Sequence, residues 1–184
     1  MKKKYIILLN LILMVLPLCS FMQFQAEEYQ LKAAFLERFT RFIDWPNGSD
    51  VENSSRPFVI GVLGENPFDE ILEEIYSKQK IKNKYVKTIY ISEISEINKC
   101  NLVFISKSYQ KKIQQVISYT KNKPILTVSD SKDFAKKGVL INFIIKDNKL
   151  RFEINGNAVK QSGLKISHLL MQQAIVVGDS EDGR

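Results

Sequence analysis

Apolar and polar positions follow two different periods along this chain, and each change of period marks a predicted element. From residue 28 to residue 45 apolar side chains recur with helical spacing until Pro46-Asn47-Gly48, which predicts one amphipathic helix. Later apolar runs are short and bounded by turn residues, as expected of strands. The predicted strands are 57–63, 85–91, 101–105 and 124–128. The predicted helical segments between and after them begin at Pro67 (capped by Asn66), Ser92, Tyr109 (capped by Ser108) and Asp130.

The C-terminal third carries a hairpin pattern followed by two helical segments. Two runs rich in β-branched and aromatic residues, Val139–Ile145 and Leu150–Ile154, flank the polar link Lys146–Lys149. A segment of small residues comes next, and then an apolar segment that contains Ile166, Leu169, Leu170 and Ala174. We therefore predict an antiparallel hairpin and two terminal helices.

Strands that alternate with helices indicate an α/β fold. We predict an open, mostly parallel sheet flanked by helices (Rossmann-like), with the C-terminal antiparallel hairpin and two helices. Residues 27–177 fit one domain and residues 178–184 a flexible polar tail. In such sheets ligands bind beyond the carboxyl ends of the strands, here residues 64–66, 106–108 and 129–131, although ordinary helix caps also explain these residues.

The first 26 residues have the layout of a secretory signal peptide. Three lysines precede the apolar run Tyr5–Leu18, which is shorter than the roughly 20 residues of a membrane-spanning helix. We predict cleavage after Ala26 and an exported chain. Lipid attachment at Cys19 is a less favoured alternative because Leu18 is bulky. Removal of these residues lowers the formal net charge from +7 to +4.

No residue pattern in the predicted mature chain indicates catalysis. His168 is the only histidine and Cys100 the only cysteine left after cleavage, so neither a zinc site nor an intramolecular disulfide is expected. Gly61 and Gly64 form only a fragment of a dinucleotide-binding motif, and a nucleophile elbow is missing. The lysines are scattered, which argues against nucleic acid as a partner. We predict no enzymatic activity, no metal and no cofactor.

Three stretches in the same order, Leu31–Pro46, Phe58–Leu72 and Gly138–Ala174, resemble the YfiR-like family of periplasmic regulators. The first keeps a helix that ends in an acidic-Trp-Pro step, and the third keeps Arg151–Asn155 and a Gly-Leu-Lys-Ile-Ser segment. The resemblance implies a non-enzymatic periplasmic α/β protein, commonly a dimer. It also implies an inner-membrane partner, in the best-known members a diguanylate cyclase that the regulator represses, which lowers cyclic di-GMP. A histidine kinase would serve equally well as partner. Disulfides tune some members, but the lone Cys100 departs from that pattern.

Two function classes remain open at this stage: a protein-binding regulator and a periplasmic small-molecule-binding sensor domain. For the first we select contact candidates on the wide apolar faces of the first and last predicted helices, although core packing also explains them: Phe42, Trp45, Leu169 and Met171. For the second, Arg151, Glu153 and Asn155 alternate on one face of the second hairpin strand, where Arg151 could bind a small anion. Structural hydrogen bonding is the other explanation of these three residues.

Overall fold

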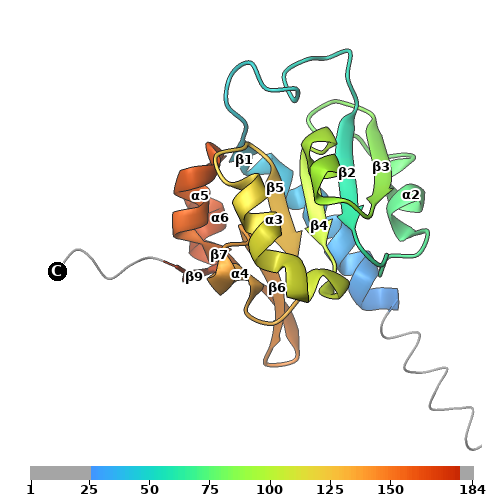
Figure 1. Ribbon diagram of the computed structural model, residues 1–184. Coiled ribbons are helices and arrows are strands. Elements are labelled where there is room, and N and C mark those ends of the chain that lie inside the picture. Colours follow the sequence, from blue (N-terminus) through green and yellow to red (C-terminus); the bar gives the residue numbers. More distant parts are fainter. Residues whose placement is uncertain (1–25, 179–184) are drawn as a thin grey trace, which may run out of the picture.

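The computed structural model describes residues 26–178, so the predicted signal peptide, Cys19 and most of the predicted tail lie outside the described residues. A seven-stranded sheet forms the centre in the order β3-β2-β4-β5-β6-β7-β9 (Figure 1). Its strands are β2 (Phe58–Leu63), β3 (Val86–Ile91), β4 (Leu102–Ile105), β5 (Leu126–Ser129), β6 (Ile141–Lys146), β7 (Lys149–Asn155) and β9 (Ile175–Val177). Strands β2 to β6 pair in parallel, β6 and β7 pair antiparallel, and β9 runs parallel to β7. The predicted α/β fold with a mostly parallel sheet is confirmed.

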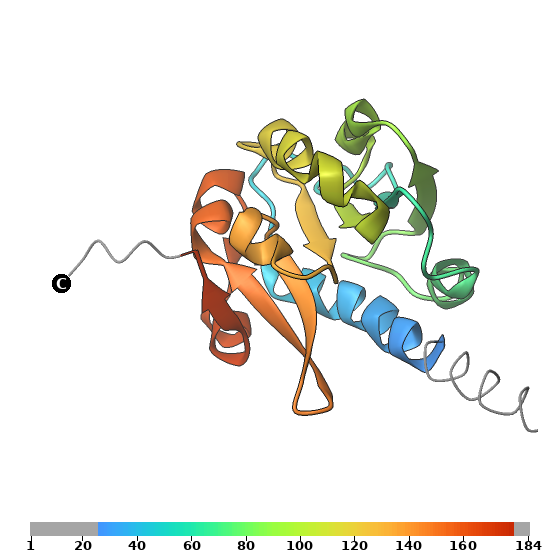
Figure 2. The same cartoon turned by 60° about the horizontal axis from the view of Figure 1, so that its bottom comes forward.

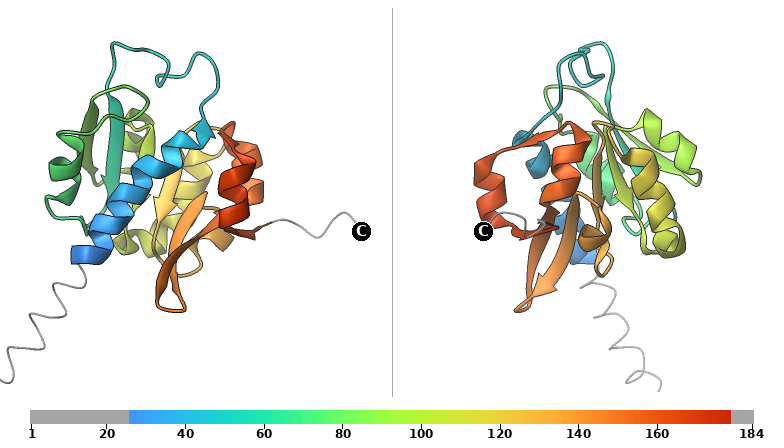
Figure 3. Two further views of the ribbon diagram at one scale, coloured as in Figure 1. Left: turned by 180° about the vertical axis from the view of Figure 1, so that it is seen from behind. Right: turned by 60° about the vertical axis from the view of Figure 1, so that its left-hand side comes forward.

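Helices cover both faces of this sheet. The described helices are the first helix (residues 26–41), α2 (Ile71–Tyr76), α3 (Ile113–Thr120), α4 (Phe134–Lys137), α5 (Gly156–Ser162) and α6 (His168–Gln173), with the 3₁₀ helices η1 (Ile94–Lys99) and η2 (Lys107–Lys112). The first helix crosses one face, and α3, α4 and the 3₁₀ helices cover the other (Figures 2 and 3). Strands β4 and β5 are buried throughout because both of their faces are covered, which explains their continuous apolar sequences.

The first helix is fixed by aromatic packing against the hairpin strands. Phe39 is fully buried, and its ring centroid lies 5.0 Å from that of Phe152 and 5.5 Å from that of Phe143. Burial of one such side chain contributes about 1.5–3 kcal/mol. The predicted hairpin is confirmed: Asp147 and Asn148, the two residues between β6 and β7, both have positive φ (51° and 55°), as a type I′ turn requires.

The prediction that the first helix continues to residue 45 is wrong. The helix ends at residue 41, and Ile43–Asp44 form strand β1, which pairs antiparallel with β8 (Lys165–Ile166). Ile166 therefore lies in a strand and not in the last helix. The peptide N–H of Ser167 also donates to the carbonyl of Phe42 at 2.9 Å. Local periodicity missed this pairing because its two partners lie at opposite ends of the domain.

Three of the predicted helix starts are also wrong. Asn66 accepts a hydrogen bond from the Phe68 peptide N–H (2.9 Å), which closes a turn, and α2 begins only at Ile71. Ser106, not Ser108, caps the segment after β4, and this segment starts as the 3₁₀ helix η2 before α3 begins at Ile113. After β5, α4 begins at Phe134, later than the predicted Asp130-Ser131 start.

Candidate functional site

The pairing of β1 with β8 brings the two predicted contact segments together. Phe42 and Trp45 flank β1, and α6, which carries Leu169 and Met171, follows β8 directly. Figure 3 shows the end of the first helix beside the C-terminal helices. Two segments from opposite ends of the sequence thus form one region of the surface.

The four predicted contact residues differ strongly in exposure. Leu169 is 62% exposed, whereas Trp45 is only 8% exposed and packs edge-on against Phe58, with ring centroids 5.7 Å apart. Phe42 and Met171 are half-buried against the same core. Only Leu169 therefore offers a large apolar surface to a partner.

Strand β9 adds two exposed apolar side chains that the sequence analysis missed. Ile175 is 36% exposed and Val176 is 40% exposed, and β9 is a border strand of the sheet. Among the described residues β9 pairs only with β7, so its outer edge has peptide groups available to another strand. The run of β-branched residues Ile175–Val177 could have indicated this strand. We call Leu169, Ile175 and Val176 the apolar edge.

Of the three predicted ligand-binding residues, Asn155 has a clear structural role. Its Oδ1 accepts from the Ala158 peptide N–H at 2.7 Å and so caps α5, and its Nδ2 donates to the Ala135 carbonyl at 2.7 Å. Asn155 is buried, and these bonds join β7 to both α4 and α5.

Arg151 and Glu153 lie on the same strand, β7, but in different surroundings. Arg151 is exposed and Glu153 is half-buried. Glu153 Oε2 and both side-chain amide atoms of Asn142, which pairs with it across β6, are buried and have no hydrogen-bond partner among the described residues. Glu153 is therefore the member of the trio with a buried polar atom left for a further bond, and its role in ligand binding stays a prediction.

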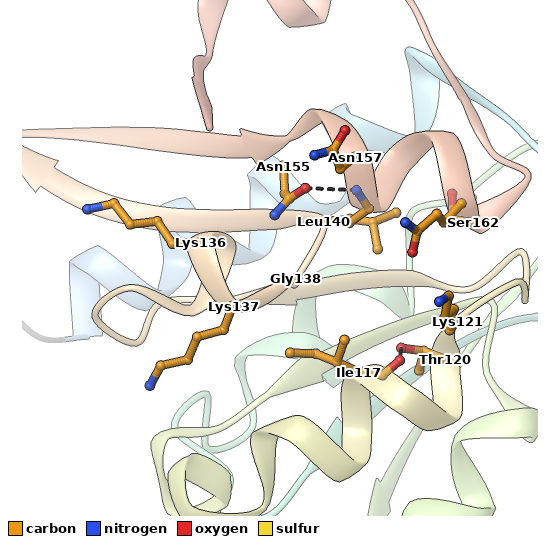
Figure 4. A pocket seen from close by; sticks show the side chains of 12 residues that line it. Ile117, Thr120, Lys121, Lys136, Lys137, Gly138, Leu140, Asn155, Asn157 and Ser162 are labelled. Carbon is orange, nitrogen blue, oxygen red and sulfur yellow. Dashed lines mark hydrogen bonds between the residues drawn. The ribbon is translucent and has the colours of Figure 1, made fainter. Parts of the chain in front are cut away.

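A basic cavity of about 180 Å³ lies between α3, α4 and α5 (Figure 4). Lys121, Lys136 and Lys137 line it together with amide side chains, and none of its lining residues is acidic. In Figure 4 the lysines of α4 lie on one side of the cavity and Lys121 lies on the other. Asn155 and Asn157 form the wall nearest to the C-terminal end of the described chain. The sequence analysis did not identify this cavity, since its lysines lie in separate segments.

At the carboxyl ends of the strands, the usual ligand position of this fold, several polar side chains make contacts within the protein. Ser108 Oγ accepts from the Glu65 peptide N–H at 3.1 Å, and the backbone of Gly64 touches Ser108 and Tyr109 so closely that a Cβ would clash. Asp130 accepts from Tyr29 at 2.8 Å and from the buried Lys32 at 2.6 Å. Burial, together with the Asp130 carboxylate, raises the pKa of Tyr29. These contacts give Ser108 and Asp130 structural roles, whereas the buried Ser131 Oγ has no hydrogen-bond partner among the described residues.

Metal and thiol chemistry have little support in the described part of the chain. Residues 26–178 contain no group of three or more His, Cys, Asp or Glu side chains that could hold a metal ion. Cys100 is a buried free thiol, and burial raises its pKa to about 12. Its Sγ fills the space beside Gly61, where a Cβ would clash with it. Gly61 is therefore explained by packing and not by nucleotide binding.

Comparison with known proteins identifies the family. Residues 29–174 match the YfiR/HmsC-like family, which spans nearly all of the described residues. The chain belongs to this family. YfiR/HmsC-like proteins are periplasmic regulators. No curated protein matches the sequence. None of the helices within residues 26–178 is long and apolar enough to cross a membrane.

Two solved structures resemble this YfiR/HmsC-like chain in fold. An ABC domain from Streptococcus pneumonia in complex with L-Trp has 12% identity and a TM-score of 0.50, covering 65% of this chain and 55% of that chain. A conserved domain protein from Vibrio cholerae has 11% identity and a TM-score of 0.48, covering 70% of this chain and 60% of that chain. This chain thus spans little more than half of either structure, and the first likeness supports the α/β fold alone.

Proposed function

We propose that this protein is a non-enzymatic periplasmic regulator that binds the periplasmic sensor region of an inner-membrane diguanylate cyclase and holds the cyclase inactive. The observation that carries the proposal is the apolar edge, which combines exposed side chains with a border strand whose outer edge has no partner strand among the described residues. Membership in a family of periplasmic regulators supports the same function. No arrangement of catalytic groups among the described residues competes with it.

The apolar edge provides both affinity and orientation. Peptide groups along β9 could extend the sheet by one strand of the partner, which fixes the register, while pockets for alternate side chains select the sequence. Burial of the 62% of Leu169 that is exposed contributes about 1–2 kcal/mol. Repression requires that the edge bind the inactive state of the cyclase more tightly than the active state, since a ligand shifts an equilibrium only by its difference in affinity.

The test compares two matched substitutions in cells of the native species. Leu169→Asp introduces a charge into the apolar edge, and Leu31→Asp places the same change at an exposed position (47%) on the first helix, away from that edge. Deletion of the gene is expected to raise cellular cyclic di-GMP several-fold. The unaltered protein and Leu31→Asp should restore the low level, whereas Leu169→Asp should not, although circular dichroism shows it folded.

Capture of envelope proteins separates the alternatives. The unaltered protein and Leu31→Asp should retain a diguanylate cyclase from solubilised inner membrane, and Leu169→Asp should lose it. Unchanged cyclic di-GMP on deletion, together with capture of a histidine kinase, would reject the cyclase while keeping a regulatory role. Unchanged cyclic di-GMP and no captured membrane protein would favour the small-molecule-binding sensor instead, for which Glu153 and the basic cavity are the places to search.

A further inference from the structure

A hollow of about 430 Å³ lies at the β3 border of the sheet and is lined by residues of β2, β3 and η1. Val59 of β2 and Ile89 of β3 give it an apolar floor, and both side chains are only half-buried above the core. Lys87, Glu96 and Lys99 supply its charged groups. We call this hollow the β3 groove. Its volume is within the range of about 300–1,000 Å³ that is typical of small-molecule sites.

The floor of the β3 groove is a gap in the cover of the sheet. Strands of a parallel sheet are normally covered on both faces. At the C-terminal end of β3 the 3₁₀ helix η1 provides this cover, and Ile91 is buried there in one cluster with Ile97 and Cys100. Earlier along the two strands the cover is incomplete, because Val59 is the one residue of β2 that is not buried and Ile89 is only half-buried. The groove thus leaves apolar surface available to a ligand.

The charged groups of the groove favour a ligand with a single negative charge. Lys87 is exposed and lies beside Val59 in the register of β2 and β3. Lys99 Nζ donates a hydrogen bond to Glu96 Oε1 at 2.9 Å, which lowers the pKa of the Glu96 carboxyl and keeps it ionised at neutral pH. Two lysines (+2) and one glutamate (−1) give the lining a formal net charge of +1. An ammonium group has three N–H donors, so Lys99 can bind a second acceptor beside Glu96.

We propose that the β3 groove binds an amphipathic monoanion, an aliphatic carboxylate of the fatty-acid class, with its chain on Val59 and Ile89 and its carboxylate between Lys87 and Lys99. Burial of the chain supplies affinity, and the two ammonium groups fix the direction in which the ligand lies. The groove is at the β3 border of the sheet and the apolar edge is at the opposite border, β9 (Figure 1). A ligand and a partner protein can therefore be bound together, and this inference does not depend on which partner the apolar edge binds.

Titration of the ¹⁵N-labelled protein, produced from the full-length sequence, with octanoate tests the proposal by amide NMR. Octanol has the same chain without the charge, and acetate has the charge without the chain. Octanoate should shift the amide signals of Val59, Lys87 and Ile89 and bind with millimolar affinity or tighter, as expected for a ligand of about ten heavy atoms. Octanol should bind about fivefold more weakly, the value of one good ion pair at a partly exposed site, and acetate at least about tenfold more weakly.

Two variants separate the contributions of charge and apolar surface. Lys87→Gln removes one ammonium group and should weaken octanoate binding about two- to fivefold without changing octanol binding. Lys146→Gln, the same change at an exposed lysine at the end of β6 in the hairpin, is the matched control and should leave both affinities unchanged. Ile89→Thr keeps a β-branched residue in β3 but reduces the apolar floor, so it should weaken octanoate and octanol equally. Circular dichroism verifies that each variant is folded.

The titration of the unmodified protein decides the proposal even if a variant fails to fold, because its shifted signals report where the ligand binds. Octanol that binds as tightly as octanoate would reject the carboxylate position between Lys87 and Lys99. Equal losses in Lys87→Gln and Lys146→Gln would mean that octanoate responds only to overall charge, which also contradicts the proposal. Shifts confined to the basic cavity or to the apolar edge, or no shifts at all, would overturn it.

Discussion

Substitution of Asn155 with alanine separates a structural role of this residue from the ligand-binding role predicted from the sequence. Asn155 makes two side-chain hydrogen bonds, one that caps α5 and one to the buried Ala135. Loss of an asparagine cap costs about 1 kcal/mol. Loss of the bond to Ala135 costs about another 1 kcal/mol, a moderate figure because the Ala135 carbonyl keeps its bond from the Gly138 peptide N–H. We therefore expect the free energy of unfolding to fall by about 2 kcal/mol.

Urea denaturation followed by circular dichroism measures this change. With a slope of about 2 kcal/mol/M, the midpoint of Asn155→Ala should lie about 1 M below that of the unaltered protein, with the slope unchanged. The matched control is Asn157→Ala, two residues further along α5, whose amide donates to the exposed Gly178 carbonyl in the described part of the chain. It should stay within about 0.5 kcal/mol of the original stability. A midpoint for Asn155→Ala equal to that of Asn157→Ala would refute the assigned structural role.

Three further predictions concern the core. Between pH 8 and pH 10 the unaltered protein should lose about 1 kcal/mol more stability than Cys100→Ala. The reason is that the Cys100 thiol ionises near pH 9 in the unfolded chain but stays protonated in the fold, where its pKa is raised to about 12. Urea titrations at several pH values measure the difference, and stability curves that run parallel for the two proteins would contradict it. Gly61→Ala should destabilise the fold by about 1–3 kcal/mol, because the added Cβ clashes with Cys100. The double variant Gly61→Ala/Cys100→Ala should recover most of this loss. If the effects of the two substitutions are additive in the double-mutant cycle, the contact is rejected. Tyr76→Phe removes the buried 2.6 Å bond to the Ala33 carbonyl and should lower the melting temperature by about 2–4 °C in calorimetry, whereas an unchanged temperature would mean that the bond contributes nothing.

The sequence was sufficient to predict those elements whose determinants lie within one short stretch of the chain. The hairpin was predictable because the strands β6 and β7 are adjacent in sequence and the link between them holds residues that tolerate positive φ. The buried strands β2, β4 and β5 were predictable because strands covered on both faces need apolar residues throughout.

Pairing between strands that are distant in sequence, and the exposure of individual side chains, could not be predicted from local sequence patterns. The residues after position 41 continue the apolar period of a helix, yet Ile43 pairs with Ile166 from the far end of the domain, and no local pattern contains that partner. Trp45 and Leu169 are both large apolar residues near helix ends, but one is buried and the other exposed, which depends on tertiary packing alone. The lysines of the basic cavity come together only because α3 and α4 lie side by side in the fold.

The pairing of β1 with β8 has a consequence for the order in which the domain is completed. During synthesis the N-terminal part of the chain emerges first. The apolar face of the first helix, with Leu36 and Phe39, is therefore present before the hairpin strands against which it packs. Phe39 finds Phe143 and Phe152 only when the hairpin has emerged, and β1 finds β8 later still. Closing such a long loop is slow. Until the hairpin has appeared, Phe39 therefore lacks its two aromatic partners and leaves hydrophobic surface exposed, the kind of surface that chaperones bind and from which aggregation begins.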